Sequence, residues 1–149
     1  MTVGRTAAIF GCAGPQLAAE ERAFFRDADP FGFIVFARNV QTPDQLRRLT
    51  ADLRDAVGRD APILVDQEGG RVQRLRAPYW REWAPPLETA LAARSPAHAA
   101  TILALRATLI AAELRSVGID ANCAATDFGG SKRVILRMNH QRSHRRSQL

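Results

Sequence analysis

Charged residues follow directly on a short apolar run in the middle of the chain. Ile63, Leu64 and Val65 show no polar alternation, which is typical of a strand buried on both faces. Asp66 and Glu68 come next, followed by two glycines and several arginines. A charged residue at the carboxyl end of a parallel strand is where many α/β proteins place their chemistry. The spacing therefore predicts a functional site at this strand exit, although surface charges that pair among themselves would give the same pattern.

Alternating strands and helices are predicted to position this site. Thr42 and Pro43 are typical of a helix start, Gln45 is placed to complete a capping box, and Gly58 is typical of a helix end. Apolar runs and helical periodicity predict the other elements in the same way. The expected order is strand 6–12, helix 17–26, strand 31–36, helix 43–57, strand 63–65, helix 96–117 and strand 119–123.

This order of elements predicts an α/β fold with a parallel sheet and right-handed crossovers. Either a (β/α)8 barrel or an open doubly wound sheet would satisfy it. No Gly-x-Gly-x-x-Gly motif follows the first strand and no Walker lysine motif occurs, which disfavours a nucleotide-binding sheet. We therefore predict a partial (β/α)8 TIM barrel, comprising about the first four strands with their surrounding helices.

The positive charge of the chain is concentrated at its carboxyl end. The chain has 21 basic and 15 acidic residues, for a formal net charge of +6. Residues 129–149 hold six of the basic residues and no acidic one, so the other 15 basic residues balance the 15 acidic ones. Because residues 1–128 are neutral, the body of the chain has no nucleic-acid signature, and we expect no nucleic-acid partner.

Membrane, signal and metal motifs are not evident in the sequence. No apolar run approaches the roughly 18–20 residues of a membrane span, and the run 7–13 is shorter than a usual signal region. Cys12 and Cys123 have no metal-site spacing and do not suggest a disulfide scaffold. We expect no membrane partner, no metal and a reducing cytoplasmic location.

Aromatic residues gather in a segment with three prolines, residues 77–86, which is predicted to be irregular. Tyr79, Trp80 and Trp83 all lie here. Aromatic faces can line a sugar site, but packing as a lid on the rim of the fold is the favoured interpretation.

Three segments carry a family resemblance: Phe-Ala-Arg-Asn at 36–39, Val-Asp-Gln-Glu-Gly-Gly-Arg-Val-Gln-Arg at 65–74, and Ala-Glu-Leu-Arg-Ser-Val-Gly-Ile-Asp at 112–120. In order, from about Thr6 to Ala124, the chain resembles the amino-terminal part of bacterial β-N-acetylhexosaminidases of glycoside hydrolase family 3. The branch concerned recycles cell-wall muropeptides. The resemblance implies a cytoplasmic (β/α)8 barrel and no cofactor. It implies retaining hydrolysis of terminal β-linked N-acetylglucosamine from cell-wall saccharides, through a covalent glycosyl–enzyme intermediate.

The resemblance also assigns residues. Asp66 matches the carboxylate that holds hydroxyls of the terminal N-acetylglucosamine, and Arg74 matches an arginine that binds the same sugar. Glu68 and Arg71 are interpreted as a loop ion pair that holds Asp66 in place. Asp66 and Glu68 are not a catalytic pair, because retaining chemistry needs carboxyl groups on opposite sides of one bond.

The family's nucleophilic aspartate, acid/base histidine and Lys-His pair have no match in this chain. His98 is the one histidine before the tail and is predicted to be exposed. No catalytic residue is therefore assigned, and the chain is interpreted as a truncated enzyme with little activity alone. The alternatives are a non-catalytic sugar-binding or complementing half-barrel, and a different barrel enzyme whose second half comes from another chain.

After Ala124 the sequence departs from the family pattern. Residues 1–124 are interpreted as the amino-terminal half of the barrel, and residues 125–149 as a basic tail, expected to be disordered and hypothesised to be a frameshift product. A genuine basic arm for RNA or an anionic membrane is the alternative. An unclosed sheet would expose strand edges and an apolar inner face, so self-association through these edges is expected.

Overall fold

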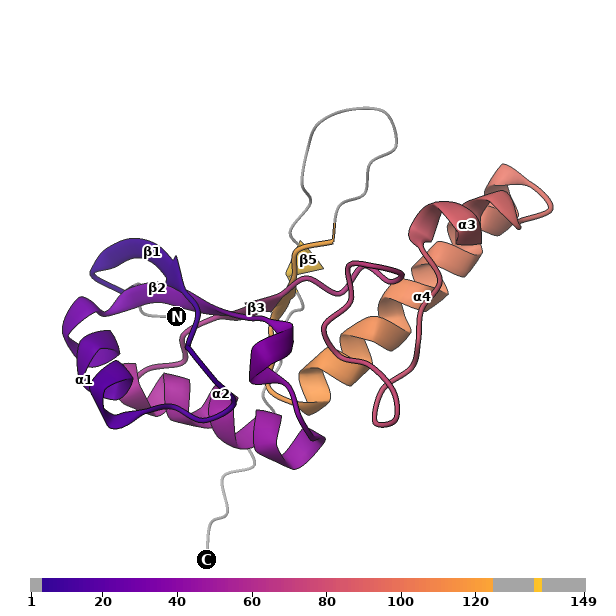
Figure 1. Cartoon of the computed structure of the whole chain (residues 1–149). Coiled ribbons are helices and arrows are strands. Elements are labelled where there is room, and N and C mark those ends of the chain that lie inside the picture. The colour runs from indigo at the N-terminus through magenta and orange to yellow at the C-terminus, as the bar shows by residue number, and fades with distance from the viewer. Residues whose placement is uncertain (1–3, 125–135, 138–149) are drawn as a thin grey trace, which may run out of the picture.

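Four short strands run parallel and lie side by side in the order in which they occur in the chain. The computed structural model, which describes residues 4–124 and 136–137, is shown in Figure 1. Adjacent pairs in register include Phe33 with Ile63 and Leu64 with Ala121. The strands are β1 (Thr6–Phe10), β2 (Pro30–Val35), β3 (Ile63–Val65) and β4 (Ala121–Asn122).

Helices follow the strands in alternation, as the sequence predicts. The helical elements are α1 (Ala19–Ala28), the 3-10 turn η1 (Ala37–Asn39), α2 (Pro43–Val57), α3 (Pro86–Leu91) and α4 (Pro96–Ser116). In Figure 1, α1 and α2 lie on the same side of the sheet, beneath β1, β2 and β3. This arrangement confirms the α/β fold with a four-strand parallel sheet and surrounding helices. α3 is a difference from the sequence prediction, which gave no helix there.

The sheet has a fifth strand that the sequence did not predict. β5 (Leu136–Arg137) pairs antiparallel with β4. The other residues of the predicted tail, 125–135 and 138–149, lie outside the described residues. Their interpretation as a disordered, frameshifted segment stays a prediction.

The start of α2 follows the sequence signals with one difference. The Thr42 hydroxyl accepts a hydrogen bond from the Gln45 amide at 3.2 Å, as an N-cap residue should. The Gln45 side chain, however, accepts from the Gln41 amide at 2.9 Å instead of from that of Thr42. Gly58 ends the helix with φ of 62°, a left-handed conformation that glycine accepts without strain.

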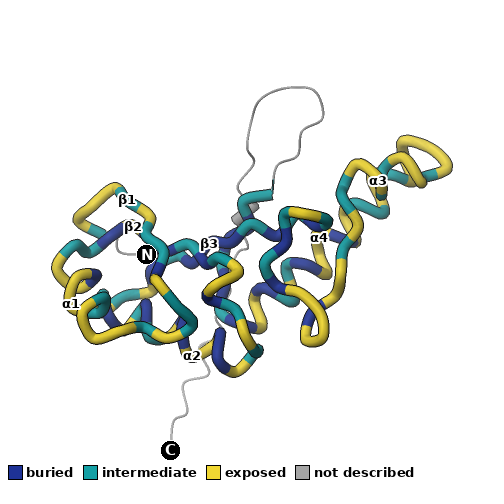
Figure 2. Tube along the Cα trace, in the orientation of Figure 1, coloured by how far each residue is buried: buried dark blue, intermediate teal, exposed yellow. Residues whose placement is uncertain are grey.

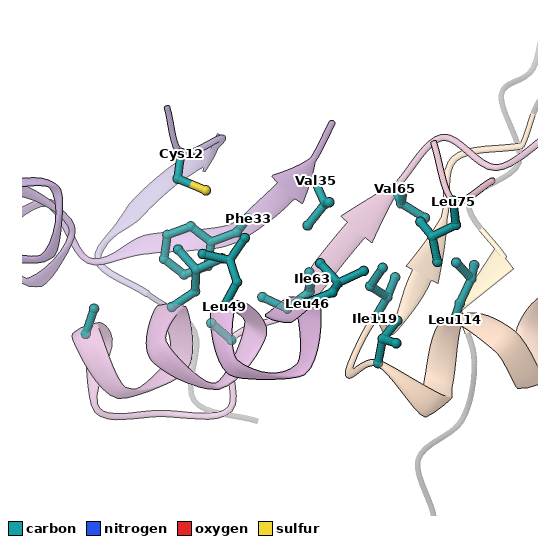
Figure 3. Packing of buried hydrophobic residues seen from close by; sticks show 14 of the residues in the cluster. Cys12, Phe33, Val35, Leu46, Leu49, Ile63, Val65, Leu75, Leu114 and Ile119 are labelled. Atoms are coloured by element: carbon teal, nitrogen blue, oxygen red, sulfur yellow. The ribbon is translucent and has the colours of Figure 1, made fainter. Parts of the chain in front are cut away.

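The hydrophobic core lies between the strands and α2. Buried residues in Figure 2 gather along β2 and β3 and on the helix faces next to them. The close-up in Figure 3 shows Phe33 and Val35 pointing toward the helix side of the sheet, where Phe33 also meets the Phe25 ring edge-to-face at 5.0 Å. The labelled cluster comprises Cys12, Phe33, Val35, Leu46, Leu49, Ile63, Val65, Leu75, Leu114 and Ile119.

The other face of the sheet is only partly covered. Ile9 of β1, which pairs with Gly32, is exposed, and Ile34 of β2 is half-buried. Leu64 of β3, which pairs with Ile34, is buried, so this second face is exposed only toward β1 and β2. Phe31 is 41% exposed although it lies on the helix side of β2 with Phe33 and Val35.

α4 packs through one end and one side. Its carboxyl end meets α2, where Thr50 and Arg54 donate hydrogen bonds to the carbonyls of Val117 and Gly118 at 2.9 and 2.8 Å. Leu114 is fully buried there. Leu109, an apolar position of the expected 96–117 helix, is 45% exposed, because it lies off the buried side that Arg106, Ile110 and Leu114 form at helical spacing.

α4 is the described helix that bears on the expected absence of a membrane span. With 21 residues and a mean hydropathy of 1.3, it is long and apolar enough to cross a membrane by length and composition alone. The charges of α4 interrupt its apolar residues, so the sequence has no uninterrupted apolar run of this length. The last residue of α4 reaches α2, where the Ser116 carbonyl accepts from Arg47 Nε at 2.8 Å, and the expectation of no membrane partner stays a prediction.

Candidate functional site

Asp66 and Arg74 meet at the carboxyl end of β3. Arg74 Nη2 donates to Asp66 Oδ2 at 2.9 Å, joining two residues eight positions apart along the loop. Their side chains are 27% and 25% exposed, so the pair is held by the protein and still reaches its surface. The structure thus brings together the two residues that the sequence analysis assigned to substrate binding, and that role stays a prediction.

The Gln67 side chain fixes the far arm of this loop. Gln67 is 1% exposed, and its Oε1 accepts from the backbone amides of Arg74 and Leu75 at 2.9 and 3.0 Å. Its Nε2 donates to the Leu75 carbonyl at 2.9 Å. The buried Gln67 side chain therefore joins the two arms of the loop, through hydrogen bonds to backbone groups of the arm that carries Arg74.

Asn122 of β4 fixes Gln67 in turn. Its side chain accepts from the Gln67 amide and donates to the Gln67 carbonyl, both at 2.9 Å. The backbone of Cys123 continues the contact by donating to the Val65 carbonyl at 2.8 Å. The residue after Asp66 is therefore anchored to the next strand by a two-bond amide contact that is buried from water.

The aromatic segment packs on the rim of the sheet. Trp80 is buried, and Trp83 packs against the core while its Nε1 donates to Glu113 Oε2 at 3.3 Å. Gln73 holds this segment through its side chain, which donates to the Arg81 carbonyl at 2.8 Å and accepts from the Trp83 amide at 3.1 Å. These contacts fit the lid interpretation for both tryptophans, whereas the Tyr79 ring is exposed.

Arg106 of α4 ties the same loop to the helix. Its Nη2 donates to the carbonyls of Glu68 and Ala84, the second at 2.8 Å, and its guanidinium lies 5.5 Å from the Trp83 ring centre. Burial lowers the pKa of Arg106 from its ordinary value. Its Nε, like that of Arg74, is buried with no hydrogen-bond acceptor among the described residues. The loop is therefore held from α4 as well as from β4.

Two other sequence predictions for this region have different outcomes. Arg74 pairs with Asp66 and Arg76 pairs with Glu82, at 2.9 and 2.8 Å, so Arg74 contacts the Asp66 carboxylate directly, and the interpretation of Glu68 and Arg71 as a loop ion pair stays a prediction. His98 is exposed at the start of α4, where its Nδ1 accepts from the Arg94 amide at 3.1 Å, which confirms its predicted exposure.

The two cysteines lie near the ends of strands, and neither is in a disulfide. Cys12 is buried, and its thiol accepts from Asn39 Nδ2 at 3.3 Å. Burial, followed by the nearby Glu21 carboxylate, raises the pKa of Cys12, which keeps it a neutral core residue. Within the described ranges no group of three potential metal ligands is found.

Sequence reasoning missed Gln67, Asn122 and Arg106. Gln67 lies inside the segment that carries the resemblance, so its position was visible, but its burial was not. Asn122 could be noticed only as a polar residue at the end of a predicted strand. Arg106 interrupts the apolar pattern of α4, and that interruption was the available signal.

Curated relatives align with most of the length of this chain. No protein-family model matches the chain. The β-hexosaminidase of Stenotrophomonas maltophilia (strain R551-3) is 38% identical over 130 residues, which cover 85% of this chain and 38% of that protein. The β-hexosaminidase of Alkalilimnicola ehrlichii is 40% identical over 129 residues, covering 85% and 37%. The chain therefore spans less than two fifths of the length of these curated relatives.

Solved structures agree with these relatives. NagZ from Neisseria gonorrhoeae in complex with N-trifluoroacetyl-D-glucosamine superposes with a TM-score of 0.75 at 28% identity, over 83% of this chain and 37% of that one. A glycoside hydrolase family 3 β-N-acetylglucosaminidase from Paenibacillus sp. FPU-7 superposes with a TM-score of 0.69 at 28% identity, over 78% and 22%. Sequence and fold thus point to the same group of proteins.

Proposed function

This chain is homologous to the amino-terminal part of the β-N-acetylhexosaminidases of glycoside hydrolase family 3, and we propose that it forms the wall of that active site which holds the terminal N-acetylglucosamine. The observation that carries the proposal is the Asp66–Arg74 pair at the carboxyl end of β3. In parallel α/β folds this edge is where substrates bind.

The geometry of the pair suits a sugar ligand. An ionised carboxylate has about four lone-pair sites, and the Arg74 contact uses one of them, so Asp66 can accept further bonds from two sugar hydroxyls. Hydrogen bonds to a charged acceptor are the stronger kind. Arg74 fixes the orientation of the carboxylate and leaves other donors of its guanidinium for ring substituents.

Bond cleavage is assigned to residues other than those described here. Retaining hydrolysis through two carboxyl groups places them about 5–5.5 Å apart on opposite sides of the scissile bond. Asp66 and Glu68 lie on one loop, and the Glu68 backbone is tied to α4 through Arg106. Within residues 4–124 and 136–137 we therefore assign binding and orientation of the sugar, and no catalytic residue.

The relatives support the proposed substrate class. The Neisseria gonorrhoeae neighbour is bound to N-trifluoroacetyl-D-glucosamine, an N-acylated glucosamine. We extend that ligand class to this chain, with a cell-wall saccharide as its source. A role in peptidoglycan recycling and a cytoplasmic location belong to the same proposal and are supported by the sequence resemblance alone.

A chimeric enzyme tests this function. Residues 6–124 of this chain would replace the matching segment of the Stenotrophomonas maltophilia β-hexosaminidase, and release of a chromophore from a β-N-acetylglucosaminide would be measured. We expect an active chimera whose kcat/KM falls roughly a hundredfold or more on Asp66→Asn, because each hydrogen bond to the charged carboxylate contributes about 1.5–3 kcal/mol.

The matched control is Asp52→Asn. Asp52 of α2 also pairs with an arginine, Arg22, at 3.0 Å, but on the helix layer. It should leave kcat/KM within about twofold, because surface ion pairs contribute little. A folded chimera that hydrolyses the substrate equally well with and without the Asp66 carboxylate would rule out the proposed role.

A complementing half-barrel without catalysis of its own is the alternative. Exposed apolar side chains favour it, both on the strands and on the outer helices: Ile9, Phe31, Leu87, Leu91, Leu105 and Leu109. Such surfaces usually mark contacts with other protein segments.

Self-association through these surfaces is the expected behaviour of the isolated chain. Sedimentation velocity should show species larger than a monomer, and a Leu105→Gln/Leu109→Gln variant should shift the distribution toward the monomer, because it removes apolar area from α4. A monodisperse parent chain with a cooperative thermal transition would contradict this expectation.

A further inference from the structure

Gln67, the residue after Asp66, connects three parts of the site. Its backbone is bonded on both sides to the Asn122 side chain, and its own side chain is bonded to the backbone of Arg74 and Leu75. Gln67 is thus the shortest link between β3, β4 and the arm of the loop that carries Arg74. Its Oε1 accepts two hydrogen bonds and its Nε2 donates one within the described structure.

This link decides where the Arg74 guanidinium lies. The ion pair with Asp66 is a single contact between two part-exposed side chains, and contacts of that kind contribute little order by themselves. The Arg74 backbone, in contrast, is held by a buried amide that cannot move without leaving polar groups unpaired. Because the Arg74 backbone is fixed, only a small set of Arg74 rotamers brings the guanidinium to Asp66.

We propose that Gln67 is a positioning residue, which sets the geometry of the Asp66–Arg74 pair and thereby the affinity for the sugar, and that Asn122 holds Gln67 in place for this purpose. The inference rests on the proposed function for the identity of the ligand, but the geometric part stands on the contacts alone. Gln67 touches no ligand in this account; it acts through Arg74.

Gln73 provides a closely matched comparison. Both glutamines are buried, at 1% and 2% exposure, both lie on the same loop, and each side chain makes three hydrogen bonds to backbone groups. The Gln73 bonds go to Leu75, Arg81 and Trp83, so they anchor the aromatic segment and do not reach Arg74. Replacing either glutamine should lower the stability of the loop. Replacing Gln67, but not Gln73, should also displace the Arg74 guanidinium.

The experiment compares Gln67→Met with Gln73→Met in the full chain. Methionine keeps the approximate volume and removes the hydrogen bonds. The first readout is the guanidinium ¹⁵N–H NMR signals of Arg74, assigned by their loss in Arg74→Lys. They should be resolved in the parent chain, collapse in Gln67→Met and persist in Gln73→Met. The second readout is titration with N-acetylglucosamine, for which Gln67→Met should raise Kd about tenfold or more, and Gln73→Met less than about threefold.

The outcomes separate this inference from the proposed function. If the parent chain shows no saturable response to N-acetylglucosamine, the proposed function fails, while the Arg74 signals still test the positioning. Equal effects of the two substitutions on both readouts, or an unchanged Arg74 signal in Gln67→Met, would overturn the inference. If Gln67→Met does not fold, Asn122→Asp takes its place, because it keeps the acceptor for the Gln67 amide and puts an oxygen in place of the donor to the Gln67 carbonyl. It should broaden the Arg74 signals, and unchanged signals in that variant would overturn the inference as well.

Discussion

Phe33→Ala is expected to leave the chain largely unfolded. Phe33 is 0% exposed at the centre of β2, and it meets the Phe25 ring edge-to-face at 5.0 Å. Truncating a buried phenylalanine costs about 3–5 kcal/mol, since the cavity cannot collapse fully. Domains of this size are stable by only about 5–15 kcal/mol, and an uncovered sheet face places this chain toward the low end. Thermal unfolding followed by circular dichroism should show a transition lowered by roughly 10 °C or more, or none at all.

Phe24→Ala is the control for this substitution. Phe24 precedes Phe25 in α1 but is 52% exposed, so the same loss of a phenyl ring should cost much less. Similar melting temperatures for the two variants would contradict the described core, because they would mean that β2 does not pack against the helices as the structure has it.

Gly69→Ala is expected to displace the loop that carries Asp66 and Arg74. Gly69 has φ of 105°, which a residue with a side chain adopts only at a cost of about 1–3 kcal/mol. A Cβ atom there would also lie 2.6 Å from the Ala84 carbonyl oxygen and in contact with Arg106 Nη2. Because Arg106 ties the loop to α4, relieving this overlap must disturb the Glu68 and Ala84 contacts. Hydrogen exchange should report faster exchange along residues 67–76.

Two other glycines separate the cost of the positive φ from the cost of the steric overlap. Gly58→Ala tests the cost of the positive φ alone, since Gly58 has φ of 62° and open space around its Cβ position. Gly14→Ala should carry neither cost, because Gly14 has no positive φ and no atom lies within 4 Å of its Cβ position. We expect the order of destabilisation to be Gly69 first, Gly58 second and Gly14 last. A Gly69→Ala protein with the exchange pattern of Gly14→Ala would show that the loop is not packed as described.

The backbone of this fold was largely predictable because its signals are local. The short apolar run 63–65 favours a buried strand, and a Thr-Pro pair followed by leucines at 46, 49 and 53 indicates the start and inner face of α2. Placing Asp66 and Arg74 in one site needed more than spacing: the resemblance named them, and the structure showed that they meet at 2.9 Å.

The buried polar residues that hold Asp66 and Arg74 in place could not be predicted. Gln67 and Asn122 are polar residues that become buried only because their amides match backbone groups elsewhere in the chain, at separations of 8 and 55 residues. Sequence periodicity carries no information on such pairings. Phe31 shows a different limit, since it lies on the same side of β2 as the buried Phe33 and Val35 but is 41% exposed near the start of the strand.

The most direct test of the account is a titration of the chain with N-acetylglucosamine, followed by amide NMR. We predict saturable shifts centred on Asp66, Gln67 and Arg74, which are lost in Asp66→Asn and kept in Asp52→Asn. Saturable shifts that survive Asp66→Asn, or a complete absence of saturable shifts in a folded parent chain, would contradict the claim that this strand exit is a sugar-binding wall.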